Sequence, residues 1–366
     1  MNKAYLLDVI YKTKDGMRDS FLEEIQKIKM EELSCKEPGN ILYKYSVNET
    51  ENNNVYLREI WVNPEEQAIH TKTEHFMMLS KLKNKYVDET IISNHEVYVP
   101  KLVNKPVCGE VVVPGSKSMT NRALLLAAFS KNSSLLRGVL FSDDSRHFLN
   151  CLEELGFELV INEKEKTVKI KGCGGSIPEK NAIINVGSAG TAARFLTAML
   201  ALSDGEYTIE CSEQMKKRPM QELFKILTEM GAKFTYIEKD GFLPVKVKGN
   251  CGACKDINMD ISKSTQFLSA MLMVTPITKS GICINITSEK KDGAYIRITR
   301  EMLKEFGVNV EFDGNVYKVE GNQNININDY YIEPDVSAAC YFYAIAAVTG
   351  GSITVKNVFF NSKQGD

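Results

Sequence analysis

The sequence predicts an α/β protein with a small ferredoxin-like α+β domain followed by a larger α/β repeat region. Up to residue 98, strand-like and helix-like segments alternate in the order β-α-β-β-α-β. Beyond residue 100, a unit recurs in which small or hydroxyl residues lead into an apolar helix. Its hydroxyls stand at positions 118, 191, 264 and 337, each 73 residues after the one before. A fixed period indicates stacked copies of one supersecondary unit.

The small domain is expected to span residues 1–98, with glycine, proline and asparagine at its turns. We expect strands at 5–11, 41–47, 55–62 and 91–97. A helix over 17–32 should bury Phe21, Ile25 and Ile28, which recur at helical spacing. A second helix should begin at Pro64 and bury Ile69, Phe76 and Leu79.

The repeat region is expected to span residues 99–366. A Leu-x-x-x-Gly signature runs in phase with the hydroxyls and ends at Gly156, Gly231 and Gly307. We expect parallel helices inside a wall of sheets, with helices such as 122–129, 191–202 and 266–274 and strands such as 165–171 and 242–247. This predicts a complete three-repeat lobe at 114–332 and the start of a second lobe at 333–366. The next such glycine would fall near residue 380, so we expect the fourth repeat to be truncated.

Composition excludes several classes of protein. The chain is 43% apolar and 25% charged, with a formal charge of -2, so bulk charge favours no nucleic-acid partner. It has no stretch of 18 apolar residues and no signal-peptide pattern, so we expect no membrane association. Nine scattered cysteines favour a reduced cytoplasm. Cys251-x-x-Cys254 has no second pair to complete a zinc site, and we expect a surface turn there.

The repeat region is expected to bind small anions. Each repeat directs a helix N-terminus, with its unpaired N–H groups, to a common edge. Fixed cations near these helix starts are Lys117, Arg122, Arg194, Lys216, Lys217 and Arg218. In a single copy the hydroxyls would more often only cap a helix. Four copies in phase favour a site for one or more multiply charged anions.

The repeat region resembles the EPSP synthase (3-phosphoshikimate 1-carboxyvinyltransferase) family over residues 101–366. The matching strings are 114–128, 142–146, 187–194, 215–219, 264–273, 294–296, 333–335 and 364–366. The resemblance implies a two-domain inside-out α/β fold of six repeats. It implies transfer of the enolpyruvyl group of phosphoenolpyruvate to the 5-hydroxyl of shikimate 3-phosphate, a step of the shikimate pathway toward chorismate and aromatic amino acids. No metal or cofactor is expected.

The resemblance also implies roles for individual residues. Lys117 matches a catalytic lysine that lies between both substrates. The residues that match shikimate 3-phosphate contacts are Lys117, Ser118, Arg122, Ser264, Thr265, Gln266 and Tyr295. Those that match phosphoenolpyruvate contacts are Lys117, Gly190, Thr191 and Arg218. Three positions depart from the family pattern, Ser188, Phe195 and Asp292, and the Asp292 carboxylate would repel a phosphate.

Further catalytic strings of the family, including its catalytic aspartate and C-terminal lysine, would fall beyond Asp366. We therefore expect residues 1–366 by themselves to be inactive in turnover. Two other functions stay open at this point. One is a relative of UDP-N-acetylglucosamine enolpyruvyl transferase, which Ser116-Lys117-Ser118 and the Ser264–Thr265 pair disfavour. The other is a non-catalytic protein that binds ligand and dimerises.

Residues 1–98 resemble the antibiotic biosynthesis monooxygenase family. The resemblance rests on Glu37-Pro-Gly39, Tyr43, the strand 56–61 and His75-Phe76. It implies a ferredoxin-like domain that pairs into a dimeric α/β barrel, and therefore a homodimer. His70 and His75, expected on one helix, are the reactive side chains of this region, and we favour a structural or dimerising role over chemistry.

Overall fold

A computed structural model describes residues 2–48, 50–99, 105–250 and 256–365. The chain divides into two compact units, Met1–Asn104 and Lys105–Asp366, and each is described by itself. The Cys251-x-x-Cys254 turn lies outside the described residues. No helix among the described residues is long and apolar enough to cross a membrane.

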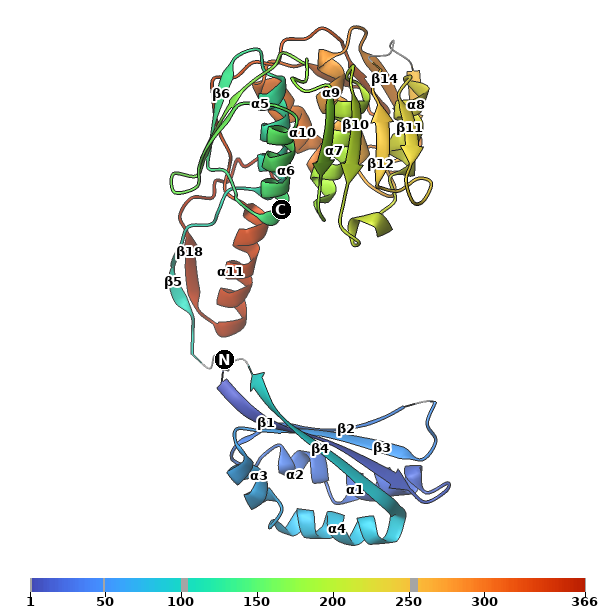
Figure 1. Cartoon of the computed structure of the whole chain (residues 1–366). Helices are drawn as coiled ribbons and strands as arrows, with labels where there is room; N and C mark the ends of the chain where they lie inside the picture. The colour runs from blue at the N-terminus through green and yellow to red at the C-terminus, as the bar shows by residue number, and fades with distance from the viewer. Residues whose placement is uncertain (1, 49, 100–104, 251–255, 366) are drawn as a thin grey trace. The chain divides into compact units, whose positions relative to one another are not determined.

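The first unit is a four-stranded antiparallel sheet with helices on one face (Figure 1). The strand order β2-β3-β1-β4 is that of a ferredoxin-like fold. Its elements are β1 (Asn2–Thr13), α1 (Arg18–Lys27), α2 (Met30–Ser34), β2 (Asn40–Val47), β3 (Asn54–Trp61), α3 (Pro64–His70), α4 (Glu74–Tyr86) and β4 (Val87–Val99). Alternate strand residues, including Leu7, Val9, Tyr11 and Leu57, point to the helices and form the core with Phe21.

Two helices predicted for this unit are each broken in two. The 17–32 helix breaks at Lys29, which adopts a left-handed conformation with φ 52° and allows Met30 to be fully buried. The helix from Pro64 ends at His70, and Thr73 caps a new helix by accepting from the Phe76 N–H. The prediction that Ile69 is buried was wrong. Its side chain is 57% exposed, and His70 takes the buried position.

The second unit contains three four-stranded sheets of the same construction. Each has a parallel pair of strands, extended by an antiparallel hairpin. The orders are β17-β6-β8-β7, β9-β10-β12-β11 and β13-β14-β16-β15, the second read from its other edge. The strands are β6 (Ser133–Arg137), β7 (Leu159–Asn162), β8 (Thr167–Lys171), β9 (Asn181–Asn185), β10 (Glu206–Glu210), β11 (Lys233–Tyr236), β12 (Val245–Lys248), β13 (Asp256–Met259), β14 (Ile282–Ile286), β15 (Val310–Phe312), β16 (Val316–Val319) and β17 (Asp329–Tyr331).

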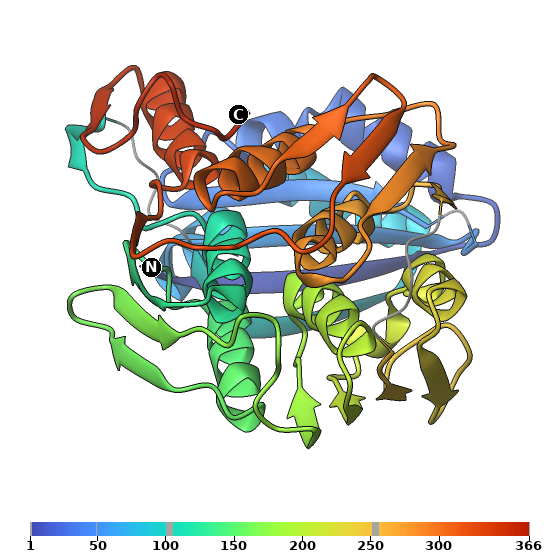
Figure 2. The same cartoon turned by 90° about the horizontal axis from the view of Figure 1, so that it is seen from above.

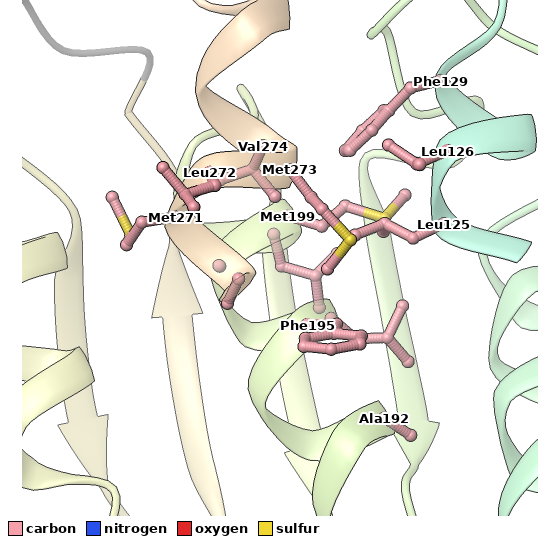
Figure 3. Close-up of a cluster of buried hydrophobic side chains, with 14 of the residues drawn as sticks. Leu125, Leu126, Phe129, Ala192, Phe195, Met199, Met271, Leu272, Met273 and Val274 are labelled. Carbon is pink, nitrogen blue, oxygen red and sulfur yellow. The ribbon is translucent and has the colours of Figure 1, made fainter. Parts of the chain in front are cut away.

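Three helices form the centre of this lobe, one from each repeat: α5 (Lys117–Phe129), α7 (Gly190–Ala201) and α9 (Gln266–Val274). They are apolar on nearly all sides and almost completely buried, as helices enclosed by protein should be. Figure 2 shows the helices of this unit lying inward of its strands, and Figure 3 shows side chains of the three helices, among them Leu125, Phe195 and Met273, meeting in one cluster. This confirms the predicted repeat fold with helices inside sheets.

Three amphipathic helices complete the repeats: α6 (Asp143–Glu154), α8 (Gln221–Glu229) and α10 (Ala294–Glu305). The Leu-x-x-x-Gly signature marks their ends, where Gly156, Gly231 and Gly307 have φ values of +81°, +110° and +84°. After each glycine, the next N–H donates to the carbonyl of the signature leucine, as Val308 does to Leu303 at 2.8 Å. This is the Schellman arrangement, which needs a residue without a β-carbon. Short 3₁₀ turns occur at η1 (Met215–Lys217) and η2 (Thr275–Ile277).

The first repeat takes its outer parallel strand from the far end of the lobe. β17 pairs with β6, although it follows the third repeat in sequence. The strand that precedes α5, β5 (Cys108–Val111), instead pairs with β18 (Ser352–Val355), which follows α11 (Val336–Thr349). Residues from both ends of this unit therefore meet in one two-stranded sheet. Just before α5, Ser116 N–H donates to Glu333 O and Asp335 N–H donates to Pro114 O, both at 2.8 Å.

Candidate functional site: a cationic cavity at the ends of three helices

A cavity of about 240 Å³ lies where the central helices begin. Its lining comes from the starts of α5, α6, α7, α9 and α10 and from the turn after η1. The lining residues are Lys117, Ser118, Arg122, Asp144, Gly190, Thr191, Arg218, Gln266 and Tyr295. The periodic hydroxyls Ser118 and Thr191 are each the second residue of their helix, so the repeat brings equivalent helix starts to one place. Three helix N-termini and three cationic side chains make the cavity attractive to anions.

The N-terminus of α7 has no side-chain cap. Its N-cap residue is Ala189, whose side chain cannot accept a hydrogen bond from the first turn. The Thr191 hydroxyl accepts a hydrogen bond from the Asn121 amide at 2.5 Å. Gly190 and Thr191, the first two residues of α7, line the cavity, so an anion there would lie close to N–H groups that the N-cap side chain does not satisfy.

Arg122 is the most deeply buried cation of the site. Its guanidinium donates to Thr299 Oγ1 at 2.8 Å and to the carbonyls of Ser118 and Tyr295 at 2.9 and 3.2 Å. Its flat face lies 5.3 Å from the centre of the Phe195 ring. Burial lowers the pKa of Arg122 to about 10, so the group remains cationic at neutral pH. It also donates to Ser269 Oγ at 3.4 Å, and among the described residues none of its hydrogen-bond acceptors is a carboxylate, so no acidic side chain neutralises its charge.

Two further guanidinium groups lie close together beside Gly190. A β-carbon added at Gly190 would stand 2.7 Å from Arg194 Nη1 and 2.8 Å from Arg218 Nη1. Arg194 is buried, donates to Gly190 O at 2.9 Å and lies 5.5 Å from the Phe267 ring. Burial, and then the neighbouring charge of Arg218, lower the pKa of Arg194 to about 10. Two like charges this close are stabilised when an anion lies between them.

Lys117 lies at the mouth of the cavity and is paired with Asp144, its Nζ 3.3 Å from Asp144 Oδ2. Sequence reasoning gave Asp144 no role, although the 142–146 string was one of the family matches. Its place at the start of α6 was the available signal, because α6 starts at the same edge as α5. The Asp144 carboxylate partly neutralises Lys117 and can orient its ammonium group.

Ser264 and Thr265 are not among the residues that line this cavity. The Ser264 hydroxyl accepts from the Gln266 N–H at 3.2 Å and so helps to begin α9. The Thr265 methyl group lies instead beside Gly293, 3.8 Å from the position of an added β-carbon there, and the Lys290 ammonium lies 3.7 Å from the same position. Gln266 does reach the cavity, and its Oε1 is buried without a hydrogen-bond partner among the described residues.

The departures from the family pattern are accommodated in different ways. Phe195 is fully buried and stacks against Arg122. The Asp292 carboxylate does not stand unpaired: Arg297 Nη1 donates to it at 3.1 Å, and the Tyr317 hydroxyl donates to it at the same distance. Part of its charge is therefore neutralised within the structure.

The histidines of the first unit are brought together by a carboxylate. His70 ends α3 and His75 lies in the first turn of α4, so the prediction of one shared helix was wrong. Both rings contact Glu37 Oε1 at 2.6 Å. Among the described residues, this is the group of histidine, cysteine or carboxylate side chains close enough together to hold a metal ion.

Comparison with known proteins decides the family of the larger unit. Residues 103–366 match the family model of EPSP synthase (3-phosphoshikimate 1-carboxyvinyltransferase). The chain belongs to the EPSP synthase family. Residues 5–78 match the family model of antibiotic biosynthesis monooxygenase, as the first unit's strand order suggests.

Individual EPSP synthase relatives agree with this assignment. A 3-phosphoshikimate 1-carboxyvinyltransferase from Trichormus variabilis is 39% identical over 271 residues, covering 74% of this chain and 63% of the relative. One from Vibrio campbellii is 40% identical over 268 residues, covering 72% and 62%. A solved EPSP synthase from Acinetobacter baumannii is 26% identical with a TM-score of 0.61, covering 71% of this chain and 57% of that one. The chain thus spans less than two thirds of the length of each of these EPSP synthases.

Proposed function

We propose that the protein transfers the enolpyruvyl group of phosphoenolpyruvate to the 5-hydroxyl of shikimate 3-phosphate and releases phosphate. The observation that carries the proposal is the convergence of Lys117, Arg122 and Arg218 with the starts of α5, α7 and α9 in one cavity. Both substrates are polyanions, and each needs several cations and N–H donors in fixed positions. The same groups would stabilise charge that develops in the transition state.

The two sides of the cavity suit the two substrates. On one side Ser118, Arg122, Gln266 and Tyr295 offer hydroxyl, amide and guanidinium groups to the ring hydroxyls and carboxylate of shikimate 3-phosphate. We assign Ser264 and Thr265 to its phosphate on the basis of family resemblance, with a change of their side-chain positions when the ligand binds.

On the other side, Gly190, Thr191 and Arg218 surround the open end of α7 and suit the phosphate of phosphoenolpyruvate. Lys117 lies between the two groups and is the catalytic residue of the proposal. As an ammonium held by Asp144, it can stabilise negative charge and exchange a proton with the reacting atoms.

Phosphate release tests this function. Protein that includes any sequence following residue 366 should release phosphate only when both phosphoenolpyruvate and shikimate 3-phosphate are present. Lys117→Ala should abolish release, and Lys131→Ala, on an exposed residue after α5, should leave it unchanged. Release with UDP-N-acetylglucosamine in place of shikimate 3-phosphate would refute the proposal.

We also propose that the first unit forms a homodimer through the open face of its sheet. The face opposite the helices carries apolar side chains, including Leu42 and Ile91, which are 36% and 39% exposed. Light scattering should show a dimer that Leu42→Lys weakens, while Ile69→Lys on α3 leaves it intact. A monomer at tens of micromolar wild-type protein would refute it. We also propose a cytoplasmic location, because nine cysteines scattered along the chain favour a reducing compartment.

A further inference from the structure

Three metal-ligating side chains meet in the first unit, far in sequence from the anion cavity. Glu37 lies in the turn before β2, His70 ends α3 and His75 begins α4. Glu37 Oε1 is 2.6 Å from His70 Nδ1 and 2.6 Å from His75 Nε2. All three ligand atoms lie within 4.8 Å of one another. Three separate segments of chain therefore direct one oxygen and two nitrogen atoms at a common point.

The surroundings hold this group in place. The His70 side chain is completely buried, with its ring centre 4.8 Å from that of Trp61, 5.3 Å from Tyr43 and 5.1 Å from Phe76. The side chains of Glu37 and His75 are 12% and 15% exposed. The group is thus anchored on one side by packed rings and is reachable from solvent on the other.

In the neutral His70 ring, one of the two nitrogens is left with a lone pair in an unfavourable position. Each 2.6 Å contact with Glu37 needs a proton or another cation in it, because two lone pairs at that distance repel. His70 Nε2 is buried and has no hydrogen-bond partner among the described residues. A neutral imidazole carries one ring hydrogen. Whichever nitrogen holds that hydrogen, the other is left with an unfavourable lone pair.

A metal ion removes this conflict. With the hydrogen at Nε2, His70 can donate weakly to the face of a neighbouring ring, and its Nδ1 lone pair is then free to bind a cation. We propose that Glu37, His70 and His75 bind a divalent transition-metal ion, with Zn²⁺ as the closest match. Two imidazoles and one carboxylate are a common three-residue set for zinc, with a water molecule as fourth ligand on an open side.

Binding of a metal ion requires the Glu37 carboxylate to move away from the two rings. Zinc bonds of 2.0–2.1 Å in a tetrahedron place ligand atoms about 3.3 Å apart, so the Glu37 oxygen would withdraw by roughly 0.7 Å from each ring. Glu37 lies in a turn that includes Gly39 at φ +78°, and its side chain is the least constrained by ring packing of the three. The contacts at 2.6 Å then describe the metal-free form, in which the carboxylate closes onto the two rings.

Cobalt titration tests the site in the 1–366 chain. The protein is stripped with a chelator and carries Cys251→Ala and Cys254→Ala, so that this cysteine pair cannot bind the probe. Co²⁺ should bind with one equivalent, give the visible bands of a four- or five-coordinate ion without thiolate charge-transfer bands, and be displaced by Zn²⁺. Glu37→Gln and His75→Gln should each weaken binding tenfold or more. Glu65→Gln, on an exposed residue of α3 in the same unit, is the matched control and should bind as the parent does.

Ring signals of the unsubstituted protein provide a readout that does not depend on the folding of a variant. Added Zn²⁺ should shift the histidine ring signals of His70 and His75 in NMR spectra and leave those of His95 and His147 in place. Absence of Co²⁺ binding, thiolate bands, or Zn²⁺ shifts confined to other histidines would overturn the proposal. The three side chains would then be a hydrogen-bonded tie between α3, α4 and the turn before β2.

Discussion

Gly190→Ala, at the start of α7, should weaken anion binding without lowering the stability of the fold. The added methyl group would stand 2.7 and 2.8 Å from the guanidinium nitrogens of Arg194 and Arg218, where ordinary contact needs at least 3.4 Å. Both groups must therefore move by more than half an ångström. Gly190 is the first residue of a helix and does not have a positive φ, so alanine fits its backbone and slightly favours the helix. The free energy of unfolding should therefore stay the same, while the affinity for phosphoenolpyruvate falls.

The expected loss follows from the groups displaced. A hydrogen bond to a charged group contributes about 1.5–3 kcal/mol, so losing one weakens binding by about 10- to 150-fold. Phosphorus NMR titration with phosphoenolpyruvate should detect this change, and affinity for shikimate 3-phosphate should change less than threefold. Gly109→Ala is the control, because nothing lies within 4 Å of its added β-carbon. A phosphoenolpyruvate affinity within threefold of the parent would refute the placement of both arginines.

Three further predictions concern other parts of the chain. Burial raises the pKa of Glu59 from its ordinary 4.5 to about 7, so its carboxyl is neutral in the folded protein at mildly acid pH, and folding loses stability as the pH rises from 4.5 through 7. Calorimetry should show the unfolding free energy of the first unit falling by about 3 kcal/mol relative to Glu59→Gln between pH 4.5 and 8, and equal pH profiles of the two proteins would exclude this. Gly307→Ala forces a β-carbon into a left-handed conformation and should lower the unfolding free energy of the second unit by about 1–2 kcal/mol. Denaturant titrations measure this change, and an unchanged unfolding free energy would contradict the Schellman arrangement at this helix end. Asp292→Ser should alter shikimate 3-phosphate affinity less than threefold, because Arg297 and Tyr317 already hold the carboxylate; a tenfold gain would show that Asp292 does repel the phosphate.

The fold of the repeat region was predictable because its signals are local. Gly156, Gly231 and Gly307 end helices through their own backbone conformation, and the apolar stretches of α5, α7 and α9 are long enough to indicate buried helices. The pairing of β5 with β18 was not predictable, because it joins strands more than 240 residues apart through backbone contacts that leave no pattern in the sequence.

The site was predictable in part for the same reason. Lys117, Thr191 and Gln266 stand at helix starts that the repeat must bring together. Asp144 was missed because its role comes from a contact between repeats. The meeting of His70 with Glu37 was missed because Thr73 begins a new helix and redirects the chain. In such places tertiary contacts decide the arrangement and helical spacing does not.

A calorimetric titration of the 1–366 chain with shikimate 3-phosphate and, separately, with inorganic sulfate at low salt is the decisive test of the proposed substrate site. Shikimate 3-phosphate should bind saturably and at least tenfold more tightly than sulfate, because several fixed donors of the cavity contact it together. Lys117→Ala and Thr265→Ala should each reduce that preference. Equal responses to the two anions, unaltered by either substitution, would mean that the helix ends form only a general anion site and would contradict the proposed function.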